Sequence, residues 1–253
     1  MKSNNNPLVS IITPSYNQGC FIEETINSVL SQSYKKIEYI IIDGGSTDET
    51  LEILKRFGDS IKWVSEPDDG QAHAVNKGFE MARGEIIGWL NSDDVYVETS
   101  VSKIVTFFME NNEVGVVYGQ GHYISKSGKI VGAYETENFD LDRLSQSCII
   151  CQPAAFFRKQ VVDENGGLDT SLDLCMDYEF WIRLAKSRVR FAHISDFLAM
   201  SRMYEDNKTM SRRVEVHAEA CRILKILFLK HASIFATAKN STGKKSSSVF
   251  DKW

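Results

Sequence analysis

The chain has 253 residues, of which 43% are hydrophobic and 25% are charged, and its formal net charge is −5. This composition is typical of a soluble globular protein, and the length allows a large buried core in one domain or two. The negative charge argues against a nucleic-acid-binding protein, because contacts with phosphates require a clustered basic surface.

The five cysteines favour a cytoplasmic protein with reduced thiols, because secreted scaffolds are short and dense in cysteine. Cys148 and Cys151 form a single Cys-x-x-Cys motif, which supplies only half of a zinc site, so we expect a structural role for both. Residues 1–7 are polar and predict a disordered N-terminus without a signal peptide. No apolar stretch approaches the ~20 residues that are needed to span a bilayer.

Short apolar segments alternate with helical patterns through the first half of the chain. Buried strands are predicted at residues 8–13, 38–42, 61–65, 85–90 and 114–118, and helices at 21–32, 49–57, 71–82 and 99–111. Ser46 and Glu49 resemble a capping box for the second helix. The alternation predicts a mostly parallel, doubly wound, Rossmann-like α/β sheet, because parallel neighbours need crossover connections. The loops after the first four strands then lie along one edge, where such sheets bind nucleotides.

The second half has a different pattern, which we interpret as an extension of the same domain. A hairpin is predicted around Ser125–Gly128, short strands at 154–157 and 197–203, and an amphipathic helix at 172–187. Residues 211–239 predict a long amphipathic helix with a basic later part. This helix either lies on an anionic membrane surface or packs on the domain with its lysines in solvent. Residues 240–253 predict a flexible tail.

Asp93 and Asp94 follow the apolar residues 86–90, at the predicted carboxyl end of a strand. Two adjacent carboxylates there suit Mg²⁺ or Mn²⁺, which take oxygen ligands and leave coordination positions open for substrate phosphates. The alternative for an isolated Asp-Asp pair is a helix cap or a solvated turn. Asp177 and Glu179 present a similar choice, because acids at the start of a helix either stabilise its dipole or take part in chemistry.

Five segments occur in the order seen in family 2 glycosyltransferases, which the chain resembles over residues 8–209. They are Val9–Asn17 (VSIITPSYN), Asp43–Thr50 (DGGSTDET), Asn76–Gly78 (NKG), Asn91–Asp94 (NSDD) and Met176–Leu184 (MDYEFWIRL). The resemblance is nearest to bacterial O-antigen and capsule transferases. It implies a GT-A fold with a nucleotide-sugar-binding half at 8–119, an acceptor-side half at 120–210 and the C-terminal helix after them.

The resemblance also implies an inverting reaction, in which a sugar moves from a nucleotide diphosphate to an acceptor hydroxyl. Asp177 matches the general base, Asp94 matches the ligand of Mn²⁺ or Mg²⁺, and Asp93 matches the contact with ribose and diphosphate. Further donor-binding positions are Pro14, Tyr16, Asp43, Asp69, Asn76 and Lys208, and acceptor-side positions are Gln152, Asp169 and Glu179. For Tyr16 and Lys208, a purely structural role remains the alternative.

Three departures from the family pattern affect these assignments. Gly44 stands where many relatives have a second acid that contacts uracil, although a UDP-sugar remains the expected donor. Tyr204 lies in a segment where relatives have a histidine that completes the metal site, and a neutral phenol is a poor ligand for a divalent cation. Another group, or the diphosphate and water, would then complete the metal shell. Met176 replaces a frequent Glu before the base.

The expected partner is a saccharide acceptor attached to a lipid at the inner face of the cytoplasmic membrane, in surface polysaccharide synthesis. The basic part of the C-terminal helix would contact that membrane. The alternatives are a nucleotidyltransferase and a non-catalytic carbohydrate- or nucleotide-binding module. This chain lacks the Gly-rich, basic loop that a nucleotidyltransferase is expected to have after its first strand. The acids at Asp94 and Asp177 count against a non-catalytic binding module.

Overall fold

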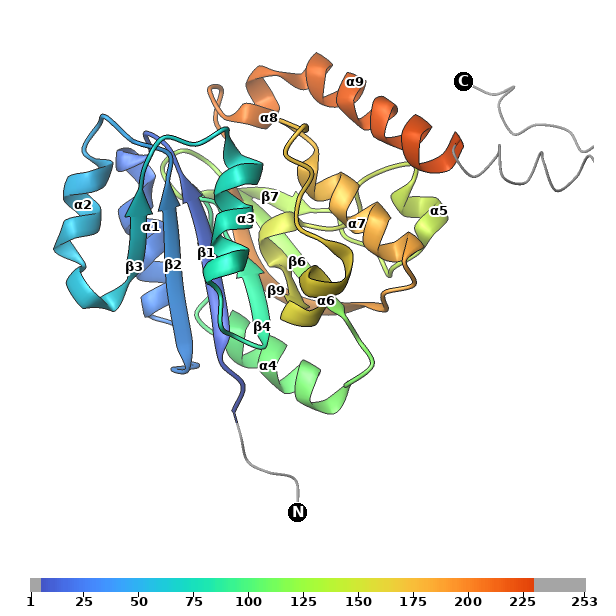
Figure 1. The fold of residues 1–253 in the computed structure, drawn as a ribbon, viewed down its shortest axis with the longest axis horizontal. Coiled ribbons are helices and arrows are strands. Elements are labelled where there is room, and N and C mark those ends of the chain that lie inside the picture. The colour runs from blue at the N-terminus through green and yellow to red at the C-terminus, as the bar shows by residue number, and fades with distance from the viewer. Residues whose placement is uncertain (1–5, 230–253) are drawn as a thin grey trace, which may run out of the picture.

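The computed structural model describes residues 6–229 and contains one large sheet with helices packed on both faces (Figure 1). The strands are β1 (Val9–Ser15), β2 (Ile37–Asp43), β3 (Lys62–Ser65), β4 (Ile86–Trp89), β5 (Val95–Tyr96), β6 (Val116–Ile124), β7 (Ile130–Tyr134), β8 (Ala155–Arg158) and β9 (Phe191–Arg202). The α-helices are α1 (Gly19–Leu30), α2 (Thr50–Arg56), α3 (Gln71–Met81), α4 (Ser100–Glu110), α5 (Leu141–Leu144), α6 (Lys159–Asn165), α7 (Met176–Lys186), α8 (Lys208–Ser211) and α9 (Arg213–Leu224).

The strands are arranged in the order β3-β2-β1-β4-β8-β6-β9-β5, and β7 pairs with β6. Strands β1 to β4, β6 and β9 run in one direction, which confirms the predicted α/β sheet of mostly parallel strands. The order contains one feature that the alternation did not predict: β8 lies between β4 and β6 and is antiparallel to both. Residues that precede β8 are thereby brought beside the end of β4.

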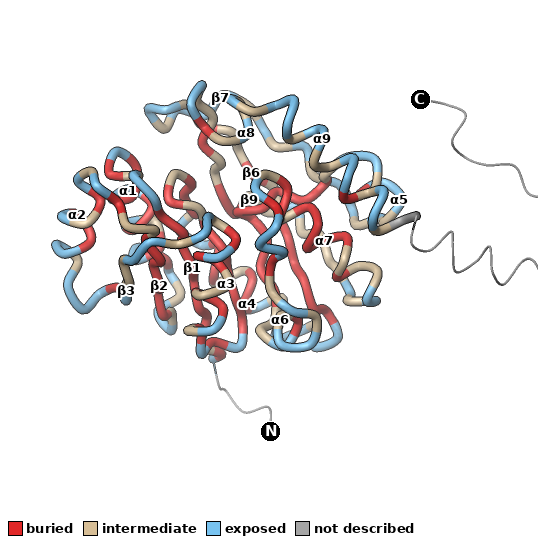
Figure 2. The backbone as a smooth tube through the Cα atoms, turned by 45° about the horizontal axis from the view of Figure 1, so that its top comes forward, coloured by how far each residue is buried: buried red, intermediate tan, exposed pale blue. Residues whose placement is uncertain are grey.

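Side chains that alternate along the central strands form two cores, one on each face of the sheet. Ile12 and Ile40 are fully buried on the face covered by α3 and α7, whereas Ile11 and Ile41 are fully buried on the face covered by α1 and α4. Figure 2 shows this burial along the strands, beneath helices whose outer sides are exposed. Because both faces are covered, apolar residues occupy most positions of the central strands.

Several predicted boundaries need correction. β1 continues through Pro14, because the fixed φ of proline is compatible with an extended strand. The predicted capping box is wrong: Ser46 donates its hydroxyl hydrogen to Asp43, and Asp48 accepts from the N–H of Thr50. The short elements β5, α5 and α6 were not predicted, since two to seven residues carry too little periodicity to be recognised.

The C-terminal helix also differs from its prediction. A break at Arg212 separates α8 from α9, and residues 225–229 form a π-helical turn. Ile223 is 2% exposed and belongs to the core beside α7, so this part of the helix packs on the domain. Residues 1–5 and 230–253, which include the rest of the predicted helix and the predicted tail, lie outside the described residues. From residue 6 to residue 229, no helix is both long and apolar enough to cross a membrane.

Glu38 fastens β2 to β1 and to the segment before β4. Its carboxylate is 6% exposed and accepts hydrogen bonds from the Ser10 hydroxyl (2.6 Å), the Gly84 N–H (3.1 Å) and both the backbone and the side chain of Arg83. Burial raises the pKa of Glu38, but these hydrogen bonds outweigh it and lower the pKa to about 2. The ionised carboxylate therefore stabilises the sheet that carries the site described below.

We expect Glu38→Gln to lower the free energy of unfolding by about 1–3 kcal/mol at pH 7, because an amide cannot satisfy the same set of donors. Urea denaturation measures this difference. The difference should shrink as the pH falls from 4.5 toward about 2, because protonation then removes the contribution of the wild-type carboxylate as well.

Glu113→Gln is the control for this measurement, since Glu113 is exposed and its carboxylate lies 3.9 Å from Arg190. It should change the free energy of unfolding by less than about 0.5 kcal/mol. A difference between wild type and Glu38→Gln that stays constant from pH 7 to pH 3 would contradict the role given to the ionised carboxylate.

Candidate active site

The carboxyl ends of β1, β2, β3 and β4 lie along one edge of the sheet, as Figure 1 shows. Asp43, fully buried at the end of β2, accepts hydrogen bonds from the N–H groups of Gly45 (3.1 Å) and Ser46 (2.9 Å). It also accepts from the hydroxyls of Ser46 (2.5 Å) and Ser65 (2.7 Å). The carboxylate of Asp43 therefore shapes the loop after β2 from within.

The loop after β1 is tied to the loop after β2. The N–H of Asn17 donates to Ser46 (2.7 Å), and the Asn17 side chain accepts from the N–H of Thr47 (2.8 Å). Pro14 is buried in β1, whereas Tyr16 is 61% exposed at the rim. The ring of Tyr16 is therefore available to stack on a planar ligand.

Asp68 takes the space beside Gly44. A Cβ atom on Gly44 would lie 2.9 Å from Oδ2 of Asp68, so a larger residue at position 44 would compete with this carboxylate. Oδ1 of Asp68 accepts a hydrogen bond from the N–H of Gly70 (2.8 Å). The neighbouring Asp69 is 95% exposed and lies 3.8 Å from His73. Sequence reasoning selected Asp69 and missed Asp68, because no local pattern reveals contact with Gly44.

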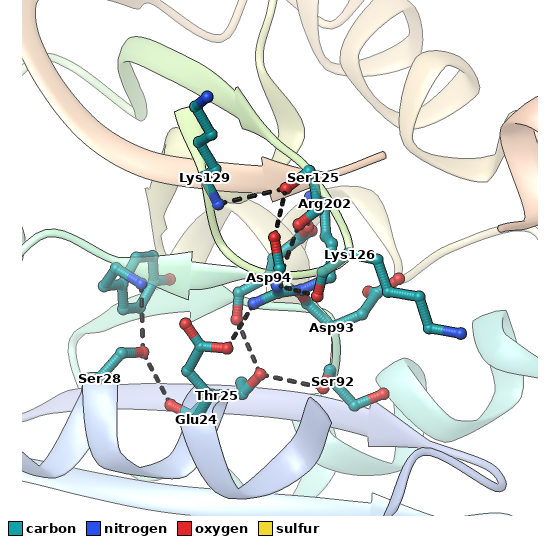
Figure 3. Close-up of polar contacts among 12 residues, drawn as sticks. Glu24, Thr25, Ser28, Ser92, Asp93, Asp94, Ser125, Lys126, Lys129 and Arg202 are labelled. Carbon is teal, nitrogen blue, oxygen red and sulfur yellow. Dashed lines mark hydrogen bonds and ion pairs between the residues drawn. The ribbon is translucent and has the colours of Figure 1, made fainter. Parts of the chain in front are cut away.

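Asp93 and Asp94 differ in accessibility. Asp94 is 3% exposed, and its Oδ1 accepts from the N–H of Arg202 (2.8 Å) while its Oδ2 lies 3.3 Å from the Asn91 amide. Asp93 is partly exposed, and only its Oδ2 has a side-chain partner within the described ranges, the hydroxyl of Tyr204 (3.1 Å). Figure 3 shows the surroundings of both acids. The metal-ligand role expected for Asp94 stays a prediction, and the accessible carboxylate of Asp93 is a second candidate for that role.

The electrostatics of the two acids fit a divalent cation. Burial raises the pKa of Asp93, although the hydrogen bond from Tyr204 and the charge of Arg202 oppose this effect. Burial and the charge of Asp93 raise the pKa of Asp94 well above its usual range. A Mg²⁺ or Mn²⁺ ion would relieve this repulsion. Across residues 6–229, no cluster of three His, Cys, Asp or Glu residues could hold a metal, so phosphates and water would complete the shell.

Gln152 connects β8 to the loop after β4 that carries the two acids, Asn91–Asp94, here named the acidic loop. Its amide N–H donates to the carbonyl of Trp89 at the end of β4 (2.7 Å), and its Oε1 accepts from the Asn91 amide (2.9 Å). Asn91 is held further by Gln71 (2.9 Å). Gln152, predicted to lie on the acceptor side, is thus 8% exposed and orients the residue that begins the acidic loop.

Asp177 lies in the first turn of α7. Burial raises the pKa of its carboxyl to about 6, and the backbone N–H groups of Tyr178 and Asp177 oppose this rise. Asp177 and the acidic loop both influence the buried thiol of Cys151. Burial raises the pKa of Cys151, and the charges of Asp94 and Asp177 raise it further. Both carboxylates therefore act electrostatically on the same buried thiol.

Asn76 and Glu179 hold the loop before Leu168 in place. The Asn76 amide donates to the carbonyl of Leu168 (2.9 Å) and accepts from its N–H (2.7 Å). Glu179 forms a bidentate pair with Arg183 (2.8 and 3.0 Å), which donates to the carbonyls of Asn165 and Gly167. These side chains are engaged within the protein, and the donor and acceptor contacts expected for them stay predictions.

Asp169 and Lys208 are also engaged. Asp169 accepts from the N–H of Ser171 (2.9 Å), and Lys208 lies 2.6 Å from Asp173. Sequence reasoning missed Glu219 of α9, whose carboxylate accepts from the N–H groups of residues 173, 174 and 175 just before α7. A glutamate within an amphipathic helix carries no signal of such a distant contact.

The family model described as glycosyl transferase family 2 matches residues 10–166. The chain belongs to glycosyltransferase family 2. An uncharacterized glycosyltransferase of Rickettsia typhi is 32% identical over 224 residues, which cover 83% of this chain and 68% of that protein. A hyaluronan synthase of Pasteurella multocida is 26% identical over 213 residues, which cover 83% of this chain but 22% of the synthase. The chain spans 34% to 38% of the length of several other Rickettsia relatives.

Solved structures share the fold of this family 2 chain. S. aureus TarS in complex with UDP-GlcNAc has a TM-score of 0.72 at 20% identity, covering 88% of this chain and 66% of that chain. The mannosyltransferase PcManGT of Pyrobaculum calidifontis, solved with GDP-Man and Mn²⁺, has a TM-score of 0.66 at 20% identity, covering 96% and 77%. This likeness confirms the GT-A fold. The family is one of glycosyltransferases, which favours a glycosyltransferase over the nucleotidyltransferase considered as an alternative.

We expect Mn²⁺ alone to raise the melting temperature, by an amount equivalent to about 2.7 kcal/mol at a hundredfold excess over its dissociation constant. The effect should be larger at pH 7.5 than at pH 5.5, because protons compete with the metal for carboxyls of raised pKa. Asp93→Asn should abolish the shift, whereas the exposed control Asp69→Asn should retain it. If Asp93→Asn retains the shift and Asp94→Asn loses it at unchanged stability, Asp94 is the ligand instead.

Proposed function

We propose that this family 2 chain transfers a hexose, with inversion, from a nucleotide diphosphate held by the loops after β1 to β4 to a hydroxyl of a saccharide acceptor. One observation carries the proposal: burial raises the pKa of the Cys151 thiol, and the charges of Asp177 and of Asp94 in the acidic loop both raise it further. Acids that approach one site from two elements can act on opposite sides of an anomeric carbon.

Asp177 would act as the general base. Its pKa of about 6 leaves it mostly ionised at neutral pH, yet more basic than an ordinary aspartate. Proton removal from the attacking hydroxyl is typically worth about 10²–10⁴-fold in rate. Attack opposite the diphosphate inverts the carbon in a single displacement, so no side chain is needed as a nucleophile.

Asp93 would hold the divalent cation, and Asp94 would fix the loop behind it. A bound cation neutralises the charge that develops on the leaving diphosphate. Asp94 contributes through the backbone: the carbonyls of Ser92 and Asp94 accept from the hydroxyl of Thr25 on α1 (2.9 and 2.8 Å). The acidic loop is thus held from α1 and from β9 by contacts within the protein.

The donor is proposed to be a UDP-sugar. Oδ1 of Asp68 accepts a hydrogen bond from Gly70, and Oδ2 lies beside Gly44 as a further acceptor. Asp68 would thus take the place of the acid that many relatives carry at the position of Gly44. Uracil presents a single imide N–H to such an acceptor, and Tyr16 is exposed for stacking. TarS was solved with UDP-GlcNAc and PcManGT with GDP-Man, so the same fold is compatible with either base.

The acceptor is proposed to be a saccharide of a surface polysaccharide, attached to a lipid at the inner face of the cytoplasmic membrane. Relatives named hyaluronan synthase and chondroitin synthase support a polysaccharide as the class of product. The inward side of α9 packs on α7, so a membrane contact of this helix would use outward residues such as Arg222 and Lys225, both exposed.

We expect Asp177→Asn to lower kcat by about 10²–10⁴-fold while donor binding in the presence of Mn²⁺ stays within about twofold. Wild-type kcat/KM should fall about tenfold per pH unit below pH 6 and level off above it, because only the ionised carboxylate accepts a proton. Initial rates with a saccharide acceptor measure both. Asp163→Asn, an exposed acid on α6, is the control. Loss of donor binding in Asp177→Asn would contradict the role of a base.

Among UDP, GDP and dTDP in the presence of Mn²⁺, we expect UDP to give the largest thermal stabilisation. Asp68→Asn should weaken UDP binding about tenfold, because a charged hydrogen-bond acceptor is replaced by a neutral one. Asp69→Asn should have no effect, since that side chain is 95% exposed. A larger stabilisation by GDP would overturn the assignment of a uridine donor.

A further inference from the structure

We propose that Lys126, in the turn between β6 and β7, binds the diphosphate of the donor, and that Arg202 is the residue that positions it. The inference rests on the proposed function, which supplies a nucleotide diphosphate beside Asp93. It adds a cation to the site from the half of the chain that follows the nucleotide-binding loops.

Arg202 joins three segments from one buried position. Its side chain is 1% exposed, and Nε donates to the carbonyl of Asp93 (2.8 Å). Nη1 donates to the carbonyls of Ser125 (3.2 Å) and Lys126 (3.0 Å), and Nη2 donates to Glu24 (2.7 Å). Because these donors point into the protein, Arg202 does not itself reach a ligand. It holds the turn within the width of a guanidinium group from the acidic loop (Figure 3).

The turn that carries Lys126 has a fixed shape. The N–H of Gly128 donates to the carbonyl of Ser125 (2.9 Å), and the N–H of Ser125 donates to the carbonyl of Lys129 (2.8 Å). Gly128 has a φ of 80°, in the region that favours glycine. The backbone of Lys126 is therefore fixed, and only its side chain is free to adapt to a ligand.

The ammonium group of Lys126 is available beside the acids. Lys126 is exposed, and its ammonium has no ion pair or hydrogen bond to any residue from 6 to 229. In Figure 3 its side chain leaves the turn on the side of Asp93, whereas Lys129 points the opposite way. Burial raises the pKa of Cys20, and the charge of Lys126 opposes this rise, so the ammonium also acts electrostatically at the start of α1.

The charge balance gives this lysine a role. When ionised, Glu24, Asp93 and Asp94 carry three negative charges against the one positive charge of Arg202. A divalent cation would neutralise the remainder, and a diphosphate would then add negative charge of its own. A lysine can offset that charge as a flexible point charge, without the fixed planar geometry that an arginine imposes.

The test compares Lys126→Met with Lys129→Met, a matched control from the same turn. The probes are UDP and uridine, each in the presence of Mn²⁺, with titration calorimetry as the measurement. We expect Lys126→Met to weaken UDP binding by about 10- to 100-fold, to leave uridine binding unchanged and to reduce the salt dependence of UDP binding. Lys126→Arg should retain most of the affinity, and Lys129→Met should bind UDP like the wild type.

The outcomes separate this inference from the proposed function. If wild type binds UDP with Mn²⁺ and Lys126→Met binds it equally well, the role of Lys126 is refuted and the proposed function stands. Equal weakening of UDP binding by Lys126→Met and Lys129→Met would also refute it, because the loss would then come from the net charge of the turn and not from a specific contact of Lys126. If wild type binds neither UDP nor GDP, both the proposed function and this inference fail. Melting temperatures within about 2 °C of wild type would exclude misfolding as the cause, because Lys126 is exposed.

Discussion

The contact between Asp94 and Arg202 is the constraint on which the candidate site depends. It joins the loop after β4 to the end of β9 across 108 positions of sequence, through a carboxylate and a backbone N–H 2.8 Å apart. Both residues are almost completely buried, so movement of the loop would leave a charged group without a partner in the interior. Asp93 is consequently fixed at the edge of the sheet, and the guanidinium of Arg202 fixes the β6–β7 turn beside it.

The insertion of β8 gives the second half of the chain its part in the site. Because β8 separates β4 from β6, Gln152 can bond the end of β4 and the acidic loop together, and the buried thiol of Cys151 is influenced by the charges of Asp94 and Asp177. The packing of this thiol requires glycine at position 121 on β6, since a side chain there would collide with the sulfur. The sheet order, rather than any further motif, brings the two groups of acids together.

Similar acidic residues acquire different properties from their surroundings. Burial raises the pKa of both carboxyls, but hydrogen bonds from Ser10 and Arg83 outweigh it and lower the pKa of Glu38, whereas the backbone N–H groups near Asp177 do not offset burial and its pKa rises. The first is suited to stability and the second to accepting a proton. The start of α7, which carries Asp177, is held in turn by Glu219 of α9, so the C-terminal helix supports the site through packing and capping.

The sequence by itself determined the α/β class, the succession of strands and the placement of acids after β2 and β4, because apolar periodicity and loop position are local properties. It also carried the motifs that relate the chain to its family. The tertiary structure alone decided that Asp93 is the accessible acid and Asp94 the buried one, that Asp68 fills the space beside Gly44, and that Asn76 and Glu179 are engaged within the protein. The reason is physical: the accessibility, charge and partners of a side chain depend on residues distant in sequence, and only folding brings those residues into contact.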